Sequence, residues 1–526
     1  MLFVISKKKE DTQKDFKAVL WASADKLRAQ MDAAEYKNLV LPLIFLKFVS
    51  DSFVAQQKKV LEMISDQSNI DFYLEPQYRE EALEDKDYYK QDVVFWVPKE
   101  ARWEELRNNA KQSDIGERID KALIAIERAN PSLKGKLDKR FGSAQLEPGT
   151  LGELIDLFST KELDEKENSR DIFGEVFEYF LGQFASNEGK KGGQFYTPTH
   201  VVKTLVSILS PDKGRVYDPC CGSGGMFVQS ERFIKAHGGT RDFISIYGQE
   251  SNPTTWRLAA INMAIRGFSA DLGLEPADTF SRDQHPDQKF DYILANPPFN
   301  ISDWGGEKYE SDVRWVYGRP PVGNANYAWL QHMLWKLRPG GQAGVVLANG
   351  SMSSSTSNEG KIREEMVRKD VVEVMVALPG QLFLNTQIQV CLWFLTNDKT
   401  QRGLDRKGET LFIDARQMGT MKNRVERILT DEDISKISDT VKSWRNDEDY
   451  EDVAGFCYNA KFEEIEKNSF VLTPGRYVGA PEEEDDGEPF DEKMKRLTSL
   501  LKKQQVEGAK LDKQISESLK KIGYEF

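Results

Sequence analysis

The stretch between residues 215 and 395 carries short apolar runs that alternate with segments of helical character. Each run is long enough for one strand, and the segments between the runs are long enough to cross from one strand to the next. Such alternation is typical of a mostly parallel sheet with crossover helices. In a sheet of this kind, ligands bind beyond the carboxyl ends of the strands. The expected strands are Arg215–Tyr217, Phe243–Tyr247, Phe290–Leu294, Gln342–Leu347, Val371–Ala377 and Gln389–Leu395.

The pattern changes before and after this region, which divides the chain into three expected domains. Residues 1–145 have apolar residues at spacings of three and four and no clear strand–turn–strand signal, so we expect a helical N-terminal domain. One of its helices should cover Glu35–Phe53. Residues 146–480 should form a Rossmann-like domain with a mostly parallel sheet, which puts the chain in the α/β class. Residues 481–526 should form an acidic linker and a helical tail.

The expected C-terminal helix carries apolar residues at roughly heptad spacing. This spacing favours packing against a partner helix, and it fits a helix folded back on its own domain equally well. Gln504 and Gly508 interrupt the series. Its apolar positions are Met494, Leu497, Leu501, Leu511, Ile515, Leu519 and Ile522.

Composition and charge narrow the classes of function. The chain has 526 residues, a net charge of −13 and four cysteines. An acidic chain is poorly suited to grip DNA over a broad surface unaided, because phosphates need a basic face. No C-x-x-C pair supports a zinc site or a disulfide framework, so no metal is expected. No apolar run is long enough to span a bilayer, and a secretory signal would have its charges before the apolar stretch, so we expect a cytoplasmic protein without a membrane partner.

A glycine-rich turn, Val216–Phe227, follows the first expected strand. Gly222, Gly224 and Gly225 let the backbone pass close to a ligand. Free N–H groups at the start of the following helix can meet a carboxylate. Dinucleotide binders and plain tight turns also have such turns, but the G-x-G-x-x-G spacing of an NAD-dependent oxidoreductase is absent.

Two acidic residues follow at positions that suit a nucleoside. Glu250 ends the second expected strand, where a carboxylate can accept hydrogen bonds from both ribose hydroxyls. Asp278 is placed to meet an adenine ring, although an aspartate in a turn or at a helix N-cap fits that position equally well.

The segment Asp291–Phe299 is the most informative one in the chain. An apolar strand runs into Pro297 and Pro298, which cannot continue a hydrogen-bonded ladder. The prolines fix the backbone and leave nearby carbonyls without a local donor. The side-chain oxygen of Asn296 and the carbonyl of Pro297 then form a rigid pair of acceptors. Phe299 supplies a flat face on which a base can stack.

Two fixed acceptors suit an exocyclic amine, which carries two N–H groups. Acceptors about 3 Å away hold the amine and draw its lone pair toward an incoming methyl group. A neutral amine that attacks a sulfonium methyl needs positioning and polarisation, and it needs no strong base. A base in duplex DNA has to flip out first, because its amine is otherwise paired and stacked. A plain turn is the competing interpretation, since Asn-Pro is common in turns.

Three motifs in this order resemble the gamma-order amino-methyltransferases, and more closely the modification (methyltransferase) subunit of type I restriction-modification systems. Trp21–Arg28 and Glu35–Lys37 are similar to the helical N-terminal domain of that family. The resemblance covers roughly residues 15–480. The motifs are Gln194-Phe195-Tyr196-Thr197-Pro198, Asp218-Pro219-Cys220-Cys221-Gly222-Ser223-Gly224-Gly225 and Asn296-Pro297-Pro298-Phe299.

This resemblance implies N6-adenine methylation of DNA with S-adenosylmethionine as the cofactor. Two such subunits usually flank one DNA-specificity subunit, and a restriction subunit joins them, which would explain the acidic charge of this chain. The expected catalytic residues are Asn296, Pro297, Pro298 and Phe299. The residues expected to bind the cofactor are Gln194, Phe195, Tyr196, Thr197, Pro198, Thr199, Asp218, Gly222, Ser223, Gly224, Gly225, Glu250 and Asp278.

Two other functions remain open. Methyltransferases that act on RNA bases or on glutamine side chains also have Asn-Pro-Pro turns. A non-catalytic DNA-binding scaffold is the alternative of a different class, although a scaffold has no need of both a cofactor turn and an acceptor pair. The loop Ser302–Asn326 interleaves aromatic residues with arginines, so it either touches DNA or carries them incidentally. These residues are Trp304, Tyr309, Arg314, Trp315, Tyr317 and Arg319.

Overall fold

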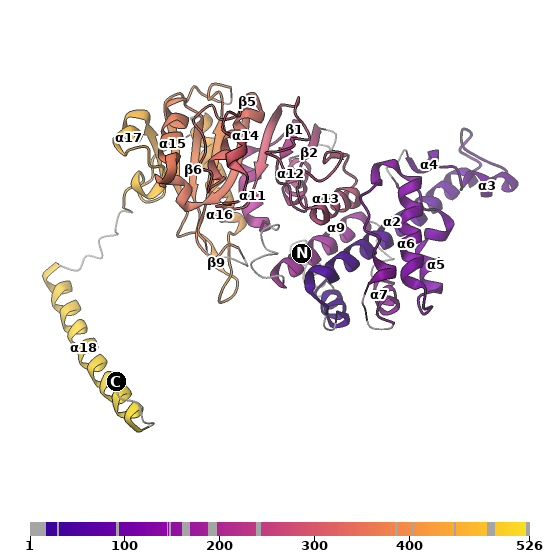
Figure 1. Cartoon of the computed structure of the whole chain (residues 1–526), viewed down its shortest axis with the longest axis horizontal. Coiled ribbons are helices and arrows are strands. Elements are labelled where there is room, and N and C mark those ends of the chain that lie inside the picture. Colours follow the sequence, from indigo (N-terminus) through magenta and orange to yellow (C-terminus); the bar gives the residue numbers. More distant parts are fainter. Residues whose placement is uncertain are drawn as a thin grey trace. The chain divides into compact units, whose positions relative to one another are not determined.

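The structure is a computed structural model of the chain, and it forms two compact units, Met1–Val478 and Gly479–Phe526. The first unit contains a bundle of helices and a sheet covered by helices (Figure 1). The second contains a single long helix. The residues that the structure describes are 17–28, 31–90, 94–144, 146, 149–159, 169–187, 197–237, 243–383, 388–401, 403–446, 449–480 and 490–521.

The helical bundle is built around α2, Ala33–Ser65. This helix starts at Asp32, whose side chain accepts a hydrogen bond from the backbone N–H of Ala34, as an N-cap residue should. The helix expected over Glu35–Phe53 is therefore confirmed, and it is longer than expected. The other helices of the bundle are residues 17–27, α3 (Pro76–Ala82), α4 (Asp87–Lys90), α5 (Trp103–Asn108), α6 (Ile115–Ala129), α7 (Thr150–Phe158) and α9 (Ser169–Asn187).

Helix α2 is long and apolar enough to cross a membrane by length and composition, with a mean hydropathy of 1.6 over 18 residues. The expectation that no apolar run reaches that length is therefore wrong. Most of this window is buried inside the bundle, and the buried Lys47 pairs with Asp51 at 2.6 Å. These features are those of the core helix of a folded domain.

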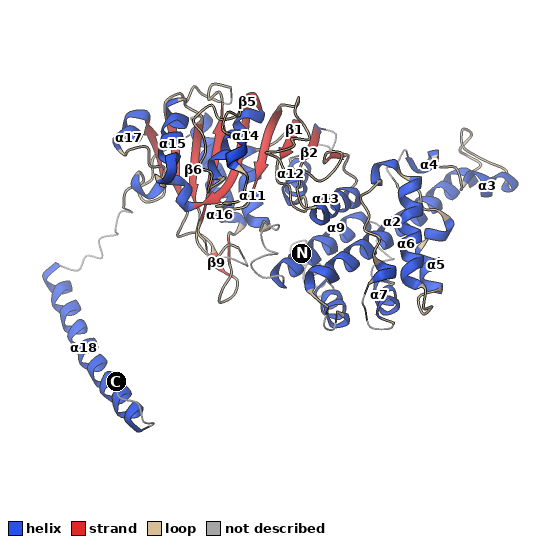
Figure 2. Ribbon diagram, in the orientation of Figure 1, coloured by secondary structure: helices blue, strands red, loops and turns tan. Residues whose placement is uncertain are grey.

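Among the described residues, nine strands form one sheet in the order β11-β8-β6-β7-β5-β4-β1-β2-β3 (Figure 2). All six strands expected from the sequence are present. The sequence did not indicate β3, β8 and β11. The strands are β1 (Gly214–Asp218), β2 (Ile244–Gly248), β3 (Ala270–Asp271), β4 (Phe290–Ala295), β5 (Leu337–Ala348), β6 (Val372–Ala377), β7 (Val390–Thr396), β8 (Glu409–Asp414) and β11 (Cys457–Lys461).

The order of the strands reverses next to β1. The chain passes from β1 to β2 and β3 on one side and then returns to β4 on the other side. β1 and β4 are parallel, with Val216 opposite Tyr292 and Tyr217 opposite Ile293. They end at the same edge of the sheet, so the turns that follow them leave the sheet side by side. Such a reversal is where open α/β sheets bind their ligands.

Helices cover both faces of the sheet, and an apolar core lies under each layer. One core joins the sheet to α11, α12 and α16, and the other joins it to α14, α15 and α17. These helices are α11 (Thr199–Leu209), α12 (Gly225–Ala236), α14 (Asn326–Lys336), α15 (Glu359–Arg368), α16 (Asp431–Asn446) and α17 (Phe462–Lys467).

Helix α13, Pro253–Arg266, joins the sheet to the helical bundle. Asn252 caps it by accepting hydrogen bonds from the backbone N–H groups of Thr254 and Thr255. One side of α13 packs in the core of the sheet, and the other side packs with α2 and α9 in the core of the bundle. Thus α9, which our domain boundary assigns to the sheet domain, also belongs to the packing of the bundle.

Helix α18, Phe490–Lys521, forms the second unit, so the expected C-terminal helix is confirmed. Several large apolar side chains along it are exposed. They are Met494, Leu497, Leu500, Leu501, Val506, Leu511 and Ile515.

An ion pair at the junction of α13 and α9 should be important for stability. Arg266, 7% exposed, lies 3.0 Å from Glu178, which also binds Arg232 at 2.9 Å. Glu178→Ala should lower the free energy of unfolding by about 3 kcal/mol, because it removes a carboxylate that pairs with the buried Arg266 charge. Urea denaturation followed by circular dichroism measures the change.

Glu117→Ala is the matched control for this prediction. Glu117 and Lys121 form a pair 3.7 Å apart in which both side chains are about two-thirds exposed or more. Its loss should change the free energy of unfolding by less than about 0.5 kcal/mol. Equal losses in the two variants would contradict the special role of the α13–α9 junction.

Candidate active site

The turn after β1 forms one wall of a cavity at the carboxyl edge of the sheet. Gly222 and Gly224 have φ of 54° and 83°, left-handed conformations that favour glycine. A side chain at Gly224 would also meet the end of Met263 at 2.9 Å. The backbone can therefore take this path, close to whatever fills the cavity, only because these positions are glycines.

Glu250 lies just beyond β2 and is held by this turn. Its Oε2 accepts a hydrogen bond from the backbone N–H of Gly222 at 3.1 Å, and its Oε1 accepts one from Asn252 at 2.8 Å. The side chain is 5% exposed and lines the cavity. Oε1 also accepts from the Ser251 hydroxyl at 3.4 Å, whereas Oε2 keeps a further lone pair that a ribose hydroxyl can use.

The segment after β3 supplies Asp278 and Thr279 to the cavity. The Thr279 hydroxyl donates to the carbonyl of Pro219 at 2.5 Å, which joins this segment to the glycine-rich turn. Asp278 accepts a hydrogen bond from the backbone N–H of Ser281 at 2.8 Å. Asp278 thus has both features that the sequence left open, the turn contact and a place in the cavity wall.

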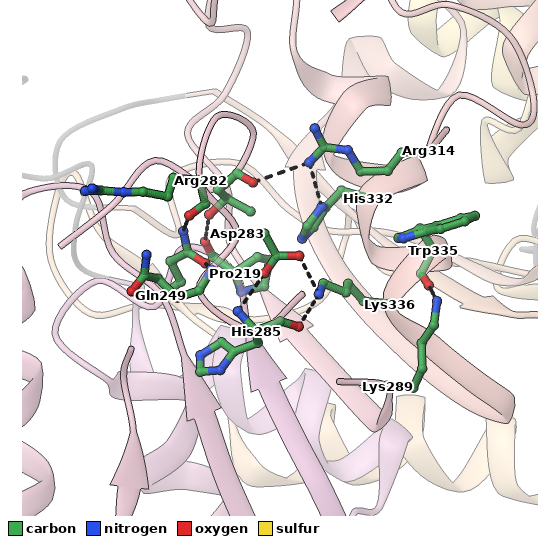
Figure 3. A network of polar contacts seen from close by, with 12 residues as sticks. Pro219, Gln249, Arg282, Asp283, His285, Lys289, Arg314, His332, Trp335 and Lys336 are labelled. Carbon is green, nitrogen blue, oxygen red and sulfur yellow. Dashed lines mark hydrogen bonds and ion pairs between the residues drawn. The ribbon is translucent and has the colours of Figure 1, made fainter. Parts of the chain in front are cut away.

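Arg314 binds the segment after β3 that carries Asp278 and Thr279 (Figure 3). Its guanidinium donates to the carbonyls of Thr279 at 3.3 Å and Phe280 at 2.9 Å, and it pairs with Asp312 at 2.6 Å. Lower in the same view, Lys336 binds Asp283 at 2.5 Å and the carbonyl of His285 at 2.6 Å.

In the loop Ser302–Asn326, Arg314 and Trp304 have structural contacts, whereas a contact of the loop with DNA stays a prediction. Arg314 and Trp304 are each 8% exposed, and the Trp304 indole donates to the carbonyl of Pro321. The aromatic rings of the loop pack on the core formed with α14, because removing their apolar surface from water is favourable. Of its two arginines, Arg319 is more exposed, and it pairs with Glu310 at 2.7 Å.

Asn296 lies at the end of β4, opposite the glycine-rich turn. Its Nδ2 donates to the hydroxyl of Thr197 at 2.9 Å, which fixes the orientation of the carboxamide. Its Oδ1 is buried and accepts no hydrogen bond from any described residue. An acceptor in that state costs about 1–3 kcal/mol, so the site favours a ligand that brings an N–H donor.

Phe299 lies farther along the same turn. Its ring meets Phe383 edge to face, with centroids 6.0 Å apart and planes at 79°. Pro298 lines the cavity, whereas Phe299 and Pro297 do not. One face of Phe299 is thus held by the segment after β6.

The charge of the cavity selects the class of ligand. Among the described residues that line it, Asp218, Glu250 and Asp278 are acidic and none is basic. Such a lining opposes the phosphates of a dinucleotide and suits a cation such as a sulfonium. The volume, about 130 Å³, is smaller than the ~300–1,000 Å³ of typical ligand pockets.

Burial controls protonation in the cavity. It raises the pKa of the Asp218 carboxyl to about 7 and raises that of Glu250 in the same direction. It also raises the pKa of the Cys220 and Cys221 thiols, so both stay protonated and neither acts as a nucleophile. A bound cation would favour the ionised carboxylates.

The cavity brings together most of the residues singled out in the sequence. Gly224, Pro198, Thr199, Pro297 and Phe299 are not part of its lining. Gln194, Phe195 and Tyr196 lie outside the described residues. Those that line it are Thr197, Asp218, Gly222, Ser223, Gly225, Glu250, Asp278, Asn296 and Pro298.

Several lining residues were not among the predicted site residues, either because they belong to no motif or because they lie within a motif without an assigned role. Trp329 on α14 is the most informative, since its Nε1 is buried and has no hydrogen-bond partner among the described residues. Only its position one helix after the Asn-Pro-Pro turn could have indicated it. The other missed residues are Pro219, Cys220, Cys221, Met226, Ser251, Thr279 and Ile301.

Fold and site together define a Rossmann-like methyltransferase domain joined to a helical domain. Residues 168–486 match the family N-6 DNA Methylase, and residues 16–158 match the family HsdM N-terminal domain.

Individual proteins give the same result. The type I restriction enzyme HindI methylase subunit of Haemophilus influenzae is 51% identical over 82% of this chain and 100% of its own length. The MjaIX methylase subunit of Methanocaldococcus jannaschii is 38% identical over 97% of this chain and 92% of its own length. The crystal structure of the type I restriction-modification system methyltransferase subunit from Streptococcus thermophilus superposes with a TM-score of 0.72, at 26% identity, covering 89% of this chain and 99% of that one.

The chain therefore belongs to the N-6 DNA methylase family, and within it to the methylase subunits of type I restriction-modification systems.

The raised pKa of Asp218 predicts a pH-dependent stability. The Asp218 carboxyl keeps its proton up to about pH 7 in the folded protein, but only up to about pH 4 in the unfolded chain. The folded protein should therefore lose stability as the pH rises from about 4 to about 7. Asp218→Asn keeps the acceptor for the Cys220 N–H and removes the buried charge. The variant's Tm should exceed the parent's by several degrees at about pH 8 and by much less at about pH 5.

Differential scanning calorimetry without ligand at both pH values tests this prediction. Asp71→Asn, at an exposed position, is the control and should change neither Tm. A change in Tm of the same size at both pH values for Asp218→Asn would contradict the assignment.

Proposed function

We propose that this methylase subunit transfers a methyl group from S-adenosylmethionine to the N6 amine of a flipped adenine at a specific DNA sequence. When bound, the cofactor supplies an electrophilic methyl group on a sulfonium. The observation that carries the proposal is the buried, unpartnered Oδ1 of Asn296, which is held in place by Thr197.

Asn296 acts on the target amine. Its Oδ1 accepts one N–H of the amine, and the carbonyl of Pro297 accepts the other, so the nitrogen lone pair points away from both. Because Thr197 fixes the carboxamide, this alignment needs no reorganisation at the moment of transfer. Phe299, steadied by Phe383, offers its ring to the flipped base.

The turn residues hold the cofactor. Glu250 accepts the ribose hydroxyls, and Asp278 and Thr279 border the adenine. The backbone of Gly222–Gly225 lies against the methionine portion, while Asp218 favours the positive charge. We assign Gln194, Phe195 and Tyr196 to the same function on their motif alone.

The alternatives are a methyltransferase for an RNA base or a glutamine side chain, and a non-catalytic scaffold. A methyltransferase for an RNA base or a glutamine would use the same chemistry on an amine, so only the substrate distinguishes it from a DNA methyltransferase. The scaffold has no use for an unsatisfied buried acceptor, which is a cost without a ligand.

Asn296→Ala should lower methyl transfer at least about 100-fold, because it removes an acceptor that acts only on the reacting amine. Cofactor binding should survive. Transfer of a radiolabelled methyl group to DNA and calorimetry with S-adenosylmethionine measure the two quantities. Asn109→Ala, at the end of α5, is the control and should leave both unchanged.

Retained turnover in Asn296→Ala would refute the role of this residue. Label that appears only in RNA or protein with the unsubstituted chain would refute DNA as the substrate. Absence of cofactor binding, even with partner subunits and DNA present, would favour a scaffold.

We further propose that the chain acts in the cytoplasm in a complex with a DNA-specificity subunit, two methylase subunits to one, and with a restriction subunit. The net charge of −13 supports a partner that provides much of the DNA affinity. The exposed apolar side chains of α18 support a helix that packs against a partner helix.

Removal of residues 490–526 should weaken assembly with the specificity subunit and leave cofactor affinity unchanged. Leu497→Ser with Leu501→Ser should have the same effect on assembly, because both replace apolar contact area. Lys495→Ser with Lys502→Ser, on the same helix, is the matched control. Gel filtration of the co-expressed subunits measures assembly, and an unchanged complex after the deletion would contradict a docking helix.

A further inference from the structure

A two-stranded hairpin extends from the side of the sheet where the carboxyl ends of the strands and the candidate active site lie. Its strands are β9, Thr420–Met421, and β10, Arg427–Ile428, which pair antiparallel. The hairpin follows the carboxyl end of β8, and β8 runs parallel to β6 and in the same direction as β4. It therefore begins at the edge where the glycine-rich and Asn-Pro-Pro turns lie. Figure 1 shows β9 projecting beyond the lower end of the sheet.

The base of the hairpin is tied to the target side of the site. The backbone N–H of Arg427 donates to the carbonyl of Gln381 at 2.9 Å, in the segment after β6. Two residues along that segment is Phe383, whose ring contacts Phe299. The hairpin is thus two contacts away from the ring on which we place the flipped base.

The start of α11 lies near the hairpin. His200, three residues after Thr197, has both ring nitrogens buried. It lies close enough to Glu426 and Lys422 for their charges to act on its pKa, which burial lowers to about 4. The ring is therefore neutral at physiological pH.

The tip of the hairpin is basic and exposed on an acidic chain. Lys422 and Arg424 lie at the tip, and Arg427 lies at the base of the hairpin, where its guanidinium donates to the carbonyl of Met418 at 3.1 Å; Glu426 is the one acidic residue between them. Glu426 is used within the turn, where it binds Lys422 at 3.0 Å and accepts from Asn423. Arg424 is exposed at the tip.

Two apolar side chains accompany these cations. Met421 and Val425 are 45% and 66% exposed. Cations beside a few apolar side chains on a narrow projection suit a DNA groove, where arginine meets phosphates and apolar groups meet sugars and bases.

We propose that the hairpin tip, residues 422–425, contacts duplex DNA on one side of the flipped base. This inference rests on the proposed DNA methylation. β8 lies four strands from β4, a distance of about 19 Å at about 4.8 Å per strand. The tip therefore reaches the duplex to one side of the target base.

The test measures DNA binding by the full chain assembled with its specificity subunit. Fluorescence anisotropy with a duplex that carries the modified sequence gives Kd at several salt concentrations. Arg424→Glu should raise Kd about tenfold or more and reduce the slope of log Kd against log salt by about 1, as expected for one lost phosphate contact. Arg424→Lys should retain most of the affinity. Cofactor affinity, from calorimetry, should be unchanged in both.

Lys213→Glu is the matched control. It makes the same reversal of charge at an exposed position just before β1, at the opposite edge of the sheet. It should change Kd little. Equal effects of Arg424→Glu and Lys213→Glu on Kd and on its salt dependence would overturn the proposal.

Two further outcomes separate the competing explanations. Loss of the specificity subunit from the Arg424→Glu complex on gel filtration would overturn the proposal in favour of a protein contact. If the unsubstituted complex methylates DNA and the Arg424→Glu complex binds DNA equally well, the proposed role of the hairpin is wrong and the proposed function is not affected. A complex that binds DNA through the hairpin without methylating it would overturn the proposed function alone.

Discussion

The site depends on the parallel pairing of β1 with β4. Because Val216 lies opposite Tyr292, both strands end at the same edge, and the turns that follow them face each other across one cavity. A shift of one residue in this register would turn every side chain of β4 to the other face of the sheet. The glycine-rich turn and Asn296, far apart in the sequence, are brought together by this backbone arrangement alone.

Within that frame, the cavity carries unfavourable groups that only a ligand relieves. Asp218 and Glu250 are buried carboxyls whose pKa is raised, and Asn296 Oδ1 is a buried acceptor without a partner among the described residues. A cation and an N–H donor are the two kinds of group that would satisfy them. The packing of the surrounding cores stabilises the fold enough to offset these unfavourable local free energies, as is usual at functional sites.

The sequence indicated the parts of the fold that have strong local patterns. Buried strands such as β4 are continuous apolar runs, and the prolines after Ala295 mark where that strand ends. β8 and β11 lie in a charged region, so their short apolar stretches resembled loops. The helix expected over Glu35–Phe53 already ran through Pro42, and the length of α2 was underestimated after Phe53, where polar residues become frequent.

The site was predictable only where residues follow one another in a motif. Glu250 and Asn296 were found because each comes directly after a strand. Trp329 reaches the cavity from α14, and no local pattern distinguishes it from a core tryptophan. The structural contacts of Arg314 could not be predicted, because its partners, the carbonyls of Thr279 and Phe280, are brought to it by the fold.

Sequencing for modified bases in cells that express this chain with its genetic neighbours tests the central claim most directly. N6-methyladenine should occur at one recurring DNA sequence in these cells, and it should be absent from cells that lack the chain. Unmodified adenines in the cells that express the chain, with the chain folded and its partners present, would contradict the claim.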